Sequence, residues 1–136
     1  MEQRILPFLQ RMNDLLDGHL LSVHLYGSCV MSDFQPGWSD IDLLCITDCP
    51  IPAAQAEKLM MLRQTMVDET GDPLFRSIEG ALVCADEFEK DQFTSVIYWG
   101  TGSQRIKTHY MLDAFSCHSV THFGRCIYGN DLSAIV

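Results

Sequence analysis

The sequence lacks any uninterrupted run of about 18 apolar residues, which excludes an ordinary membrane-spanning helix. It also lacks an excess of basic residues, because nine lysines and arginines stand against 18 aspartates and glutamates, for a formal net charge of −9. A protein that binds duplex nucleic acid through its phosphates needs a basic face. We therefore expect neither a membrane nor duplex nucleic acid as a partner, and an acidic surface of this kind suits a cationic one.

The six cysteines lack the spacing of a zinc-binding or redox motif. No Cys-x-x-Cys pair occurs, and Cys45 and Cys49 are separated by three residues. The even number leaves a secreted disulfide scaffold to be considered, but Met1 and Glu2 do not begin a signal peptide. A chain of 136 residues that is 47% hydrophobic can form a core without cross-links. We therefore expect free thiols, most of them acting as small apolar side chains, in a cytoplasmic protein.

The length indicates a single domain that spans residues 1–136. Apolar residues at helical spacing predict helices over residues 3–17 and 53–70, a further helical stretch over 104–123 broken near Asp113, and a short helix over 28–34. Pro7 is compatible with the first helix only if it falls in the first turn.

Apolar and β-branched runs predict strands over residues 20–26, 40–47, 75–85 and 92–99, with a short apolar return over 126–129. Helices that alternate with strands are typical of an α/β or α+β fold in which helices cover a sheet.

The stretch from Leu25 to Thr47 places a glycine and a hydroxyl at the end of one strand and two aspartates at the start of the next. If residues 40–47 are extended, Asp40 and Asp42 project from the same face, because side chains alternate along a strand. Two neighbouring carboxylates repel each other, and Mg²⁺ relieves this repulsion because it binds carboxylate and phosphate oxygens. Gly27 and Ser28 offer a backbone that can approach a phosphate closely.

Glu79 is a carboxylate inside an otherwise apolar strand candidate, between Ile78 and the run 81–83. Carboxylates are seldom buried without a partner, so a role beside the paired aspartates is one interpretation. The alternative is an edge strand that leaves Glu79 in solvent.

Trp99 and the pair His118 and His122 are not predicted to be site residues. We expect Trp99 to pack in the core or at its rim. His118 and His122 have the helical spacing of metal ligands, but they lack nearby acidic partners, so we do not expect a metal site there.

These features together resemble the nucleotidyltransferase superfamily, which has the DNA polymerase β-like fold. The runs HLYGS, residues 24–28, and WSDIDLL, residues 38–44, are similar to the signature of the aminoglycoside adenylyltransferases that modify streptomycin and spectinomycin. Residues 76–83 resemble the strand that carries their third carboxylate, and residues 122–129 resemble the end of their N-terminal domain.

The resemblance implies a mixed β-sheet of about four to five strands flanked by helices, and it implies two sets of site residues. The first set, which would bind Mg²⁺ and carry the catalysis, is Asp40, Asp42 and Glu79. Within it, Glu79 is either a metal ligand or the general base. The second set, which would hold the nucleotide phosphates, is Gly27, Ser28 and Ser39.

The reaction that the resemblance implies is Mg²⁺-dependent transfer of AMP from ATP to a hydroxyl group. Such a transfer needs in-line geometry, cations that neutralise the phosphates and a base near the attacking oxygen. The leading acceptor is a small cationic molecule such as an aminoglycoside. The adenylyltransferases continue into a helical C-terminal domain that binds the acceptor, and we expect this domain to be absent here.

Two alternatives stay open because of that difference. One is a minimal nucleotidyltransferase that modifies or binds a helical partner protein, as in toxin–antitoxin pairs, although those proteins usually carry arginine where this chain has Cys29. The other is a catalytically silent nucleotide-binding domain, against which three converging carboxylates argue. The sequence is compatible with a homodimer and does not determine the oligomeric state.

Overall fold

The computed structural model describes residues 2–27 and 40–132 of the chain, and its centre is one mixed, six-stranded sheet. The strands are β1 (Leu20–Tyr26), β2 (Ile41–Thr47), β3 (Ile78–Cys84), β4 (Val96–Gly100), β5 (Ser103–Lys107) and β6 (Arg125–Gly129). Their order across the sheet is β5-β4-β3-β2-β1-β6. Among the described strands, only β2 and β3 pair in parallel. The mixed sheet was predicted, and the structure adds one strand to the expected number.

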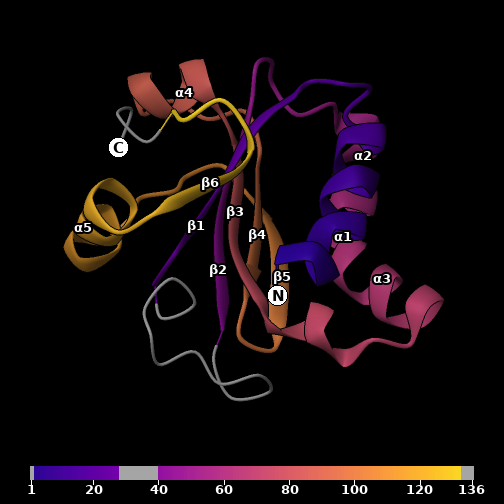
Figure 1. Cartoon of the computed structure of the whole chain (residues 1–136). Coiled ribbons are helices and arrows are strands. Elements are labelled where there is room, and N and C mark those ends of the chain that lie inside the picture. Colours follow the sequence, from indigo (N-terminus) through magenta and orange to yellow (C-terminus); the bar gives the residue numbers. More distant parts are fainter. Residues whose placement is uncertain (1, 28–39, 133–136) are drawn as a thin grey trace.

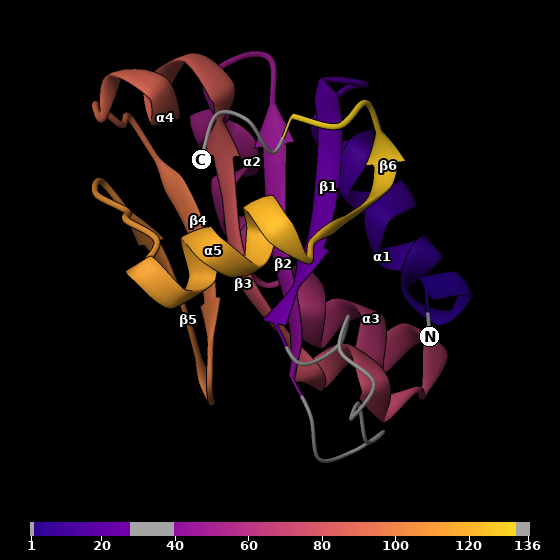
Figure 2. The ribbon, with the colours of Figure 1, turned by 60° about the vertical axis from the view of Figure 1, so that its left-hand side comes forward.

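Helices cover both faces of this sheet. Helices α1 (Glu2–Leu15), α2 (Ala53–Met60) and α3 (Leu62–Thr70) lie together on one side, and α5 (Ala114–His122) lies on the other (Figure 1). In a view turned by 60°, α5 crosses the strands (Figure 2). The short helix α4 (Ala85–Lys90) follows directly from β3, and a 3₁₀ helix (Pro73–Ser77) precedes β3.

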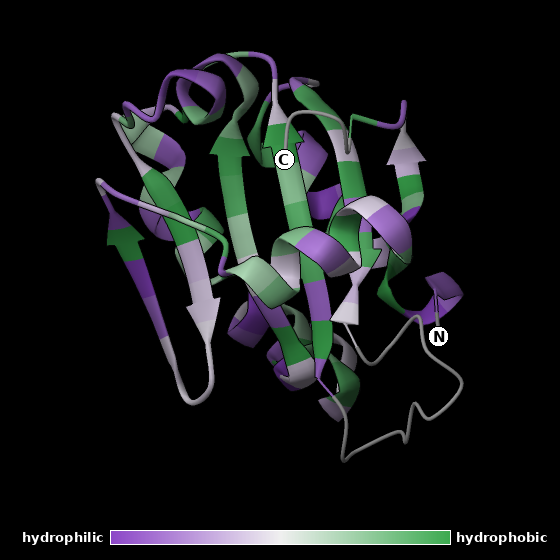
Figure 3. Cartoon of the chain, turned by 90° about the vertical axis from the view of Figure 1, so that its left-hand side faces the viewer, coloured by the Kyte–Doolittle hydropathy of each residue, from purple (hydrophilic) through white to green (hydrophobic). Residues whose placement is uncertain are grey.

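Two apolar clusters result from this arrangement, one on each face of the sheet. Leu43 of β2 belongs to the cluster under α1, α2 and α3, whereas its neighbour Leu44 belongs to the cluster under α5. Strands that are buried on both faces are expected to be apolar throughout rather than alternating. The central strands are accordingly coloured mainly as hydrophobic (Figure 3). Trp99 packs in the first cluster as expected: it is fully buried, and its ring centroid lies 5.4 Å from that of Phe8.

Two of the predicted helices differ in the structure. The predicted helix over 53–70 is interrupted at Met61, whose φ of −86° and ψ of 0° separate α2 from α3. The predicted helical stretch over 104–123 was wrong in its first part, because residues 103–107 form the edge strand β5. Asp113 caps α5 as predicted, since its Oδ1 accepts a hydrogen bond of 2.7 Å from the Ser116 N–H.

Pro7 lies inside α1, beyond the first turn, so the helix tolerates this proline at a position that the sequence analysis had treated as incompatible with it. The ring is exposed to solvent, while the buried residues Ile5, Phe8 and Leu9 hold the helix against the sheet. Tertiary packing of an apolar stripe supplies most of a helix's stability, which allows α1 to tolerate one missing N–H donor.

Other predicted boundaries shifted by a few residues. The strand predicted over 75–85 starts at Ile78, after the 3₁₀ turn, and the strand predicted over 92–99 starts at Val96. The helix predicted over 28–34 lies outside the described residues. Cys45, Cys49, Cys84, Cys117 and Cys126 are free thiols, as predicted, and Cys29 lies outside the described part of the chain. Among the described helices, none has the length and apolar character needed to cross a bilayer.

Candidate active site

The parallel pairing of β2 with β3 places Asp42 directly beside Glu79. Residues in register on neighbouring strands project from the same face, and here that face is the one covered by α5, because Leu44 and Ile46 of the same strand belong to the cluster under α5. Asp40 immediately precedes β2, two residues before Asp42, and is exposed. The structure thus brings together the three carboxylates that the sequence predicts as one site.

The electrostatics of this group are unfavourable without a cation. The pKa of Asp42 is raised to about 6, first by burial and then by the negative charges of Asp40 and Glu79. The pKa of Glu79 is also raised, first by burial and then by a hydrogen bond with Asp40 and its charge. Carboxylates that crowd together in this way retain protons more strongly than isolated ones.

Two neighbours act against the rise in the Glu79 pKa. The Thr101 hydroxyl donates a 2.9 Å hydrogen bond to Glu79 Oε2, which stabilises the ionised carboxylate. The positive charge of Arg63 also lowers the pKa of Glu79, but by less than the Thr101 hydrogen bond does. The pKa of Glu79 therefore reflects two opposing effects: burial and Asp40 favour the protonated carboxyl, and Thr101 and Arg63 favour the ionised one.

Gly27 directly follows β1 and lies beside Asp42, in a position that only glycine fills without strain. Its φ of 72° lies in the left-handed region, and a Cβ atom added there would overlap Asp42 Oδ2. Its N–H donates a 2.8 Å hydrogen bond to the hydroxyl of Ser119, which is buried on α5. Gly27 therefore leaves room for the Asp42 carboxylate. Ser28 and Ser39, the other predicted phosphate-binding residues, lie outside the described residues.

Arg63 is a buried positioning residue of this site that the sequence analysis missed. Its guanidinium donates hydrogen bonds to the carbonyls of Ile78 at 2.8 Å and Gly100 at 2.9 Å, the residues directly before Glu79 and Thr101. It also bonds to the Ser103 carbonyl at 2.9 Å and to Gln104 Oε1 at 3.0 Å. A charged residue on the apolar face of a helix, between Leu62 and Met66, is the signal that could have identified it.

A cavity of about 270 Å³ adjoins the carboxylates. Its lining includes Asp42, Glu79, Tyr26, Tyr98, Tyr110 and Asp113. Burial raises the pKa of both Tyr26 and Tyr110, so their hydroxyls stay neutral hydrogen-bonding groups near pH 7. The volume is below the ~300–1,000 Å³ of pockets that enclose a drug-sized ligand, so a nucleotide would extend beyond this cavity.

A larger cavity of about 500 Å³ is lined by residues of α1, α2 and α3, among them Arg11, Glu57 and Lys58. It is formed by the helices on the opposite side of the sheet from the face that carries Asp42. Size alone would favour it, but we assign the site to the smaller cavity because perturbed titratable groups converge there.

The residues present fit a hard divalent cation such as Mg²⁺. The donors are carboxylate oxygens, which this ion prefers, and they come from adjacent positions of two neighbouring strands. A cation would offset the repulsion that raises the pKa of Asp42 and of Glu79. Asp40, Asp42 and Glu79 are the residues that would hold it.

Residues 3–93 match the family described as "Nucleotidyltransferase domain", and the chain belongs to this family. The matched region contains Gly27, Asp40, Asp42 and Glu79.

Among solved structures, the chain is similar to the spectinomycin adenyltransferase AAD(9) from Enterococcus faecialis, whose structure holds ATP and spectinomycin, with a TM-score of 0.63 and 18% identity. The match covers 97% of this chain and 58% of that one. The toxin–antitoxin complex MntA–HpeT matches with a TM-score of 0.47 and 14% identity, over 96% of this chain and 74% of that one. At 18% identity, the match to AAD(9) shows a shared fold alone. The curated proteins include no match to this sequence.

Proposed function

We propose that this domain transfers AMP from ATP to a hydroxyl group of an acceptor, with Mg²⁺ held by Asp40, Asp42 and Glu79. The observation that carries the proposal is the in-register pairing of Asp42 with Glu79, with Asp40 directly before the strand that carries Asp42. A set of this kind suits chemistry at a phosphate, where negative charge must be neutralised and an attacking oxygen deprotonated.

In the proposed reaction, the acceptor oxygen attacks the α-phosphorus of ATP. The bond from that phosphorus to the bridging oxygen breaks, pyrophosphate leaves, and the hydroxyl proton passes to a base. When bound, Mg²⁺ would neutralise charge on the α-phosphate and on the pyrophosphate. We assign the base to Glu79, because it is the carboxylate of the neighbouring strand, in register with Asp42, and a carboxylate within hydrogen-bond reach of the attacking oxygen can accept its proton. Thr101 would orient this carboxylate through its bond to Oε2.

The acceptor in this proposal is a small cationic molecule of the aminoglycoside class, and the protein is cytoplasmic. The net charge of −9 favours a cationic acceptor, and AAD(9), which shares the fold, has spectinomycin in its structure. The free thiols are compatible with a reducing compartment. The chain corresponds to 58% of the AAD(9) chain, so the acceptor contacts belong to the proposal alone.

The test is incubation of the protein with ATP labelled at the α-phosphate, Mg²⁺ and a panel of aminocyclitols. We expect label on one acceptor class together with release of pyrophosphate, and neither product with Asp42→Asn. Saturating ATP binding without label on any member of the panel would overturn the assignment of the acceptor.

A second candidate is AMP transfer to a partner protein, which one surface feature favours. Met111, which lines the cavity, is 78% exposed, and Phe115 on the adjoining first turn of α5 is 67% exposed. Exposed apolar side chains beside a reaction site suit a protein surface better than a polar sugar. Host lysate incubated with the labelled ATP separates the two candidates, because label then appears either on a protein band or in the small-molecule fraction.

A further inference from the structure

A second group of potential ligands lies at the end of the sheet opposite to the carboxylate site. His19 directly precedes β1, whereas Asp48 and Cys49 directly follow β2. The antiparallel register pairs Leu20 with Thr47, and the Asp48 N–H donates a 3.2 Å hydrogen bond to the His19 carbonyl. Residues 29 positions apart in the chain are thereby made neighbours.

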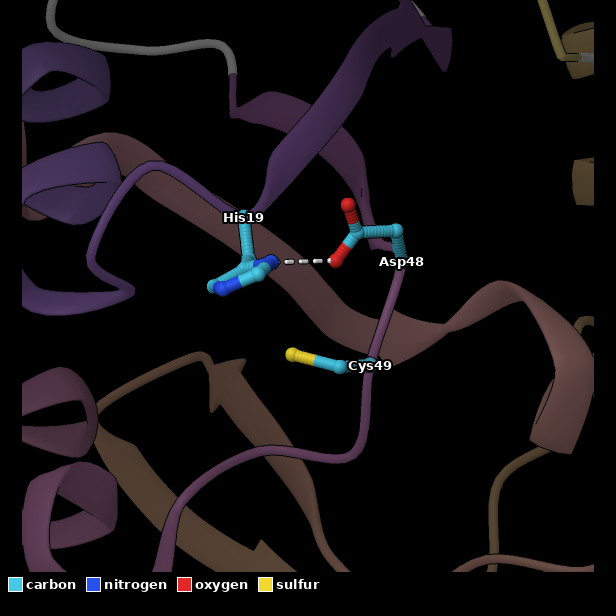
Figure 4. Close-up of side chains that lie close together, drawn as sticks. All are labelled: His19, Asp48 and Cys49. Atoms are coloured by element: carbon cyan, nitrogen blue, oxygen red, sulfur yellow. Dashed lines mark hydrogen bonds and ion pairs between the residues drawn. The ribbon is translucent and has the colours of Figure 1, made fainter.

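The three side chains point toward one another (Figure 4). His19 Nδ1 lies 2.7 Å from Asp48 Oδ1, and a ring nitrogen of His19, a carboxylate oxygen of Asp48 and the Cys49 sulfur all lie within 4.8 Å of one another. Ligand atoms around a tetrahedral metal are about 3.3–3.8 Å apart, given metal–ligand distances of about 2.0–2.3 Å. Small side-chain rotations would therefore complete such a geometry.

The backbone around this cluster is held in place by buried groups. The Thr47 hydroxyl, which is fully buried, donates a 2.6 Å hydrogen bond to the Cys49 carbonyl. The His19 N–H bonds to the Leu16 carbonyl at 3.0 Å. Positioning of this kind lowers the entropic cost of gathering ligands around an ion.

We propose that His19, Asp48 and Cys49 form a binding site for a zinc-class divalent ion, distinct from the Mg²⁺ site. One imidazole nitrogen, one carboxylate oxygen and one thiolate sulfur suit a borderline-soft ion such as Zn²⁺ or Co²⁺ and are a poor set for Mg²⁺. The thiol proton is released to solvent when the sulfur binds the ion. The side chains of His19 and Asp48 are 50% and 44% exposed, which leaves the fourth position to water.

This ion would join the turn before β1 to the connection after β2. It lies at the far end of β2 from Asp42, so its expected effect is on stability rather than on nucleotidyl transfer. The competing explanation is a plain His19–Asp48 ion pair beside an uninvolved thiol.

The experiment uses the full chain, stripped of metal with a chelator and kept reduced with a phosphine, in excess Mg²⁺ to saturate carboxylate sites. Co²⁺ is titrated first, because a thiolate ligand produces a sulfur-to-cobalt charge-transfer band in the near ultraviolet. Zn²⁺ is then titrated by calorimetry and in a thermal melt. We expect one equivalent to bind, the thiolate band to form, and the melting temperature to rise.

The matched variants are Cys49→Ser and His19→Gln, each of which should weaken Zn²⁺ binding at least tenfold, with the first also removing the band. Controls that should bind Zn²⁺ as the unmodified protein does are Cys126→Ser, Asp42→Asn and the double variant His118→Gln with His122→Gln. Absence of stoichiometric Zn²⁺ binding, absence of the thiolate band in the unmodified protein, or unchanged affinity of Cys49→Ser would each overturn the proposal.

Discussion

The two ends of the β1–β2 pair carry different ligand sets on the same scaffold. At one end Asp42 is partly buried, pairs in register with Glu79 and offers only oxygen. At the other end His19 and Asp48 are exposed, Cys49 is partly buried, and the three offer nitrogen, oxygen and sulfur. The seven residues of β2 separate the ends by roughly 20 Å. Burial decides the electrostatic cost of each cluster: the charges of the partly buried Asp42 and Glu79 destabilise the fold, whereas the exposed His19 and Asp48 form a hydrogen-bonded pair.

The largest expected effect is on catalysis. We expect Asp42→Asn to reduce nucleotidyl transfer by about a thousandfold or more, because it removes a charge that neutralises the phosphate site and is worth several kcal/mol in the transition state. The measurement is pyrophosphate release at saturating ATP and acceptor. His19→Gln, at the other end, should leave this rate within about twofold, and a comparable loss there would show that the two ends are not independent.

The next effect is on stability. Arg63→Ala should lower the free energy of unfolding by about 3 kcal/mol, because it leaves the buried carbonyls of Ile78 and Gly100 without a donor. Urea denaturation measures this loss. The exposed Arg76→Ala is the matched control and should change stability by less than about 0.5 kcal/mol. Equal losses in both variants would contradict the role of Arg63.

A smaller effect follows from the raised pKa of Asp42. Because the folded protein holds this proton more tightly than the unfolded chain, ionisation of Asp42 destabilises the metal-free fold. The cost is absent below pH 3.8, grows between pH 3.8 and about 6, and is complete above about 6. It is at most about 3 kcal/mol, and partial exposure reduces it to about 1–2 kcal/mol.

Asp42→Asn should therefore stabilise the metal-free protein by about 1–2 kcal/mol at pH 8 and by little at pH 4, although it abolishes activity. Thermal melts at the two pH values in chelator provide the measurement. Asp14→Asn, an exposed change on α1, should show no such difference. Equal stabilisation by Asp42→Asn at both pH values would exclude ionisation as its cause.

The smallest expected effects come from two threonine hydroxyls, one at each end of the β1–β2 pair. Thr101 bonds to Glu79 at the carboxylate end, and Thr47 bonds to the Cys49 carbonyl at the other end. Thr101→Val should raise the pKa of Glu79, because its hydrogen bond favours the ionised form, so the acidic limb of the pH–rate profile moves to higher pH. Thr47→Val should instead weaken Zn²⁺ binding about threefold to tenfold, through the lost bond to the Cys49 carbonyl. If either variant altered the function at the opposite end, the separation of the two sites would be wrong.

Local patterns in the sequence predicted much of the carboxylate end. The alternation of residues 40–47 placed Asp40 and Asp42 on one face, and the apolar run around Glu79 identified a strand. The edge strand β5 was missed because Gln104, Arg105 and Lys107 are polar and give no apolar strand pattern. Their strand is held by its pairing with β4 and is partly open to solvent. Ser28 and Ser39 remain predictions.

The roles of Arg63 and Thr101 could not be predicted from the sequence, since both depend on contacts between residues far apart in the chain. Arg63 lies 37 residues from Gly100, and Thr101 lies 22 residues from Glu79. Arg63 reaches Gly100 from α3, whereas the antiparallel pairing of β3 with β4 brings Thr101 beside Glu79.

By itself, the sequence predicted the three carboxylates and, through its resemblance to the nucleotidyltransferases, the fold, because the runs around Gly27 and Asp40 and the strand around Glu79 are local features. Only the tertiary structure decided that Asp42 and Glu79 are in register, that Arg63 holds the adjoining backbone, and that His19 meets Asp48 and Cys49. The physical reason is that strand pairing and helix docking set distances between residues far apart in the chain, and these distances fix which charges and ligands can interact.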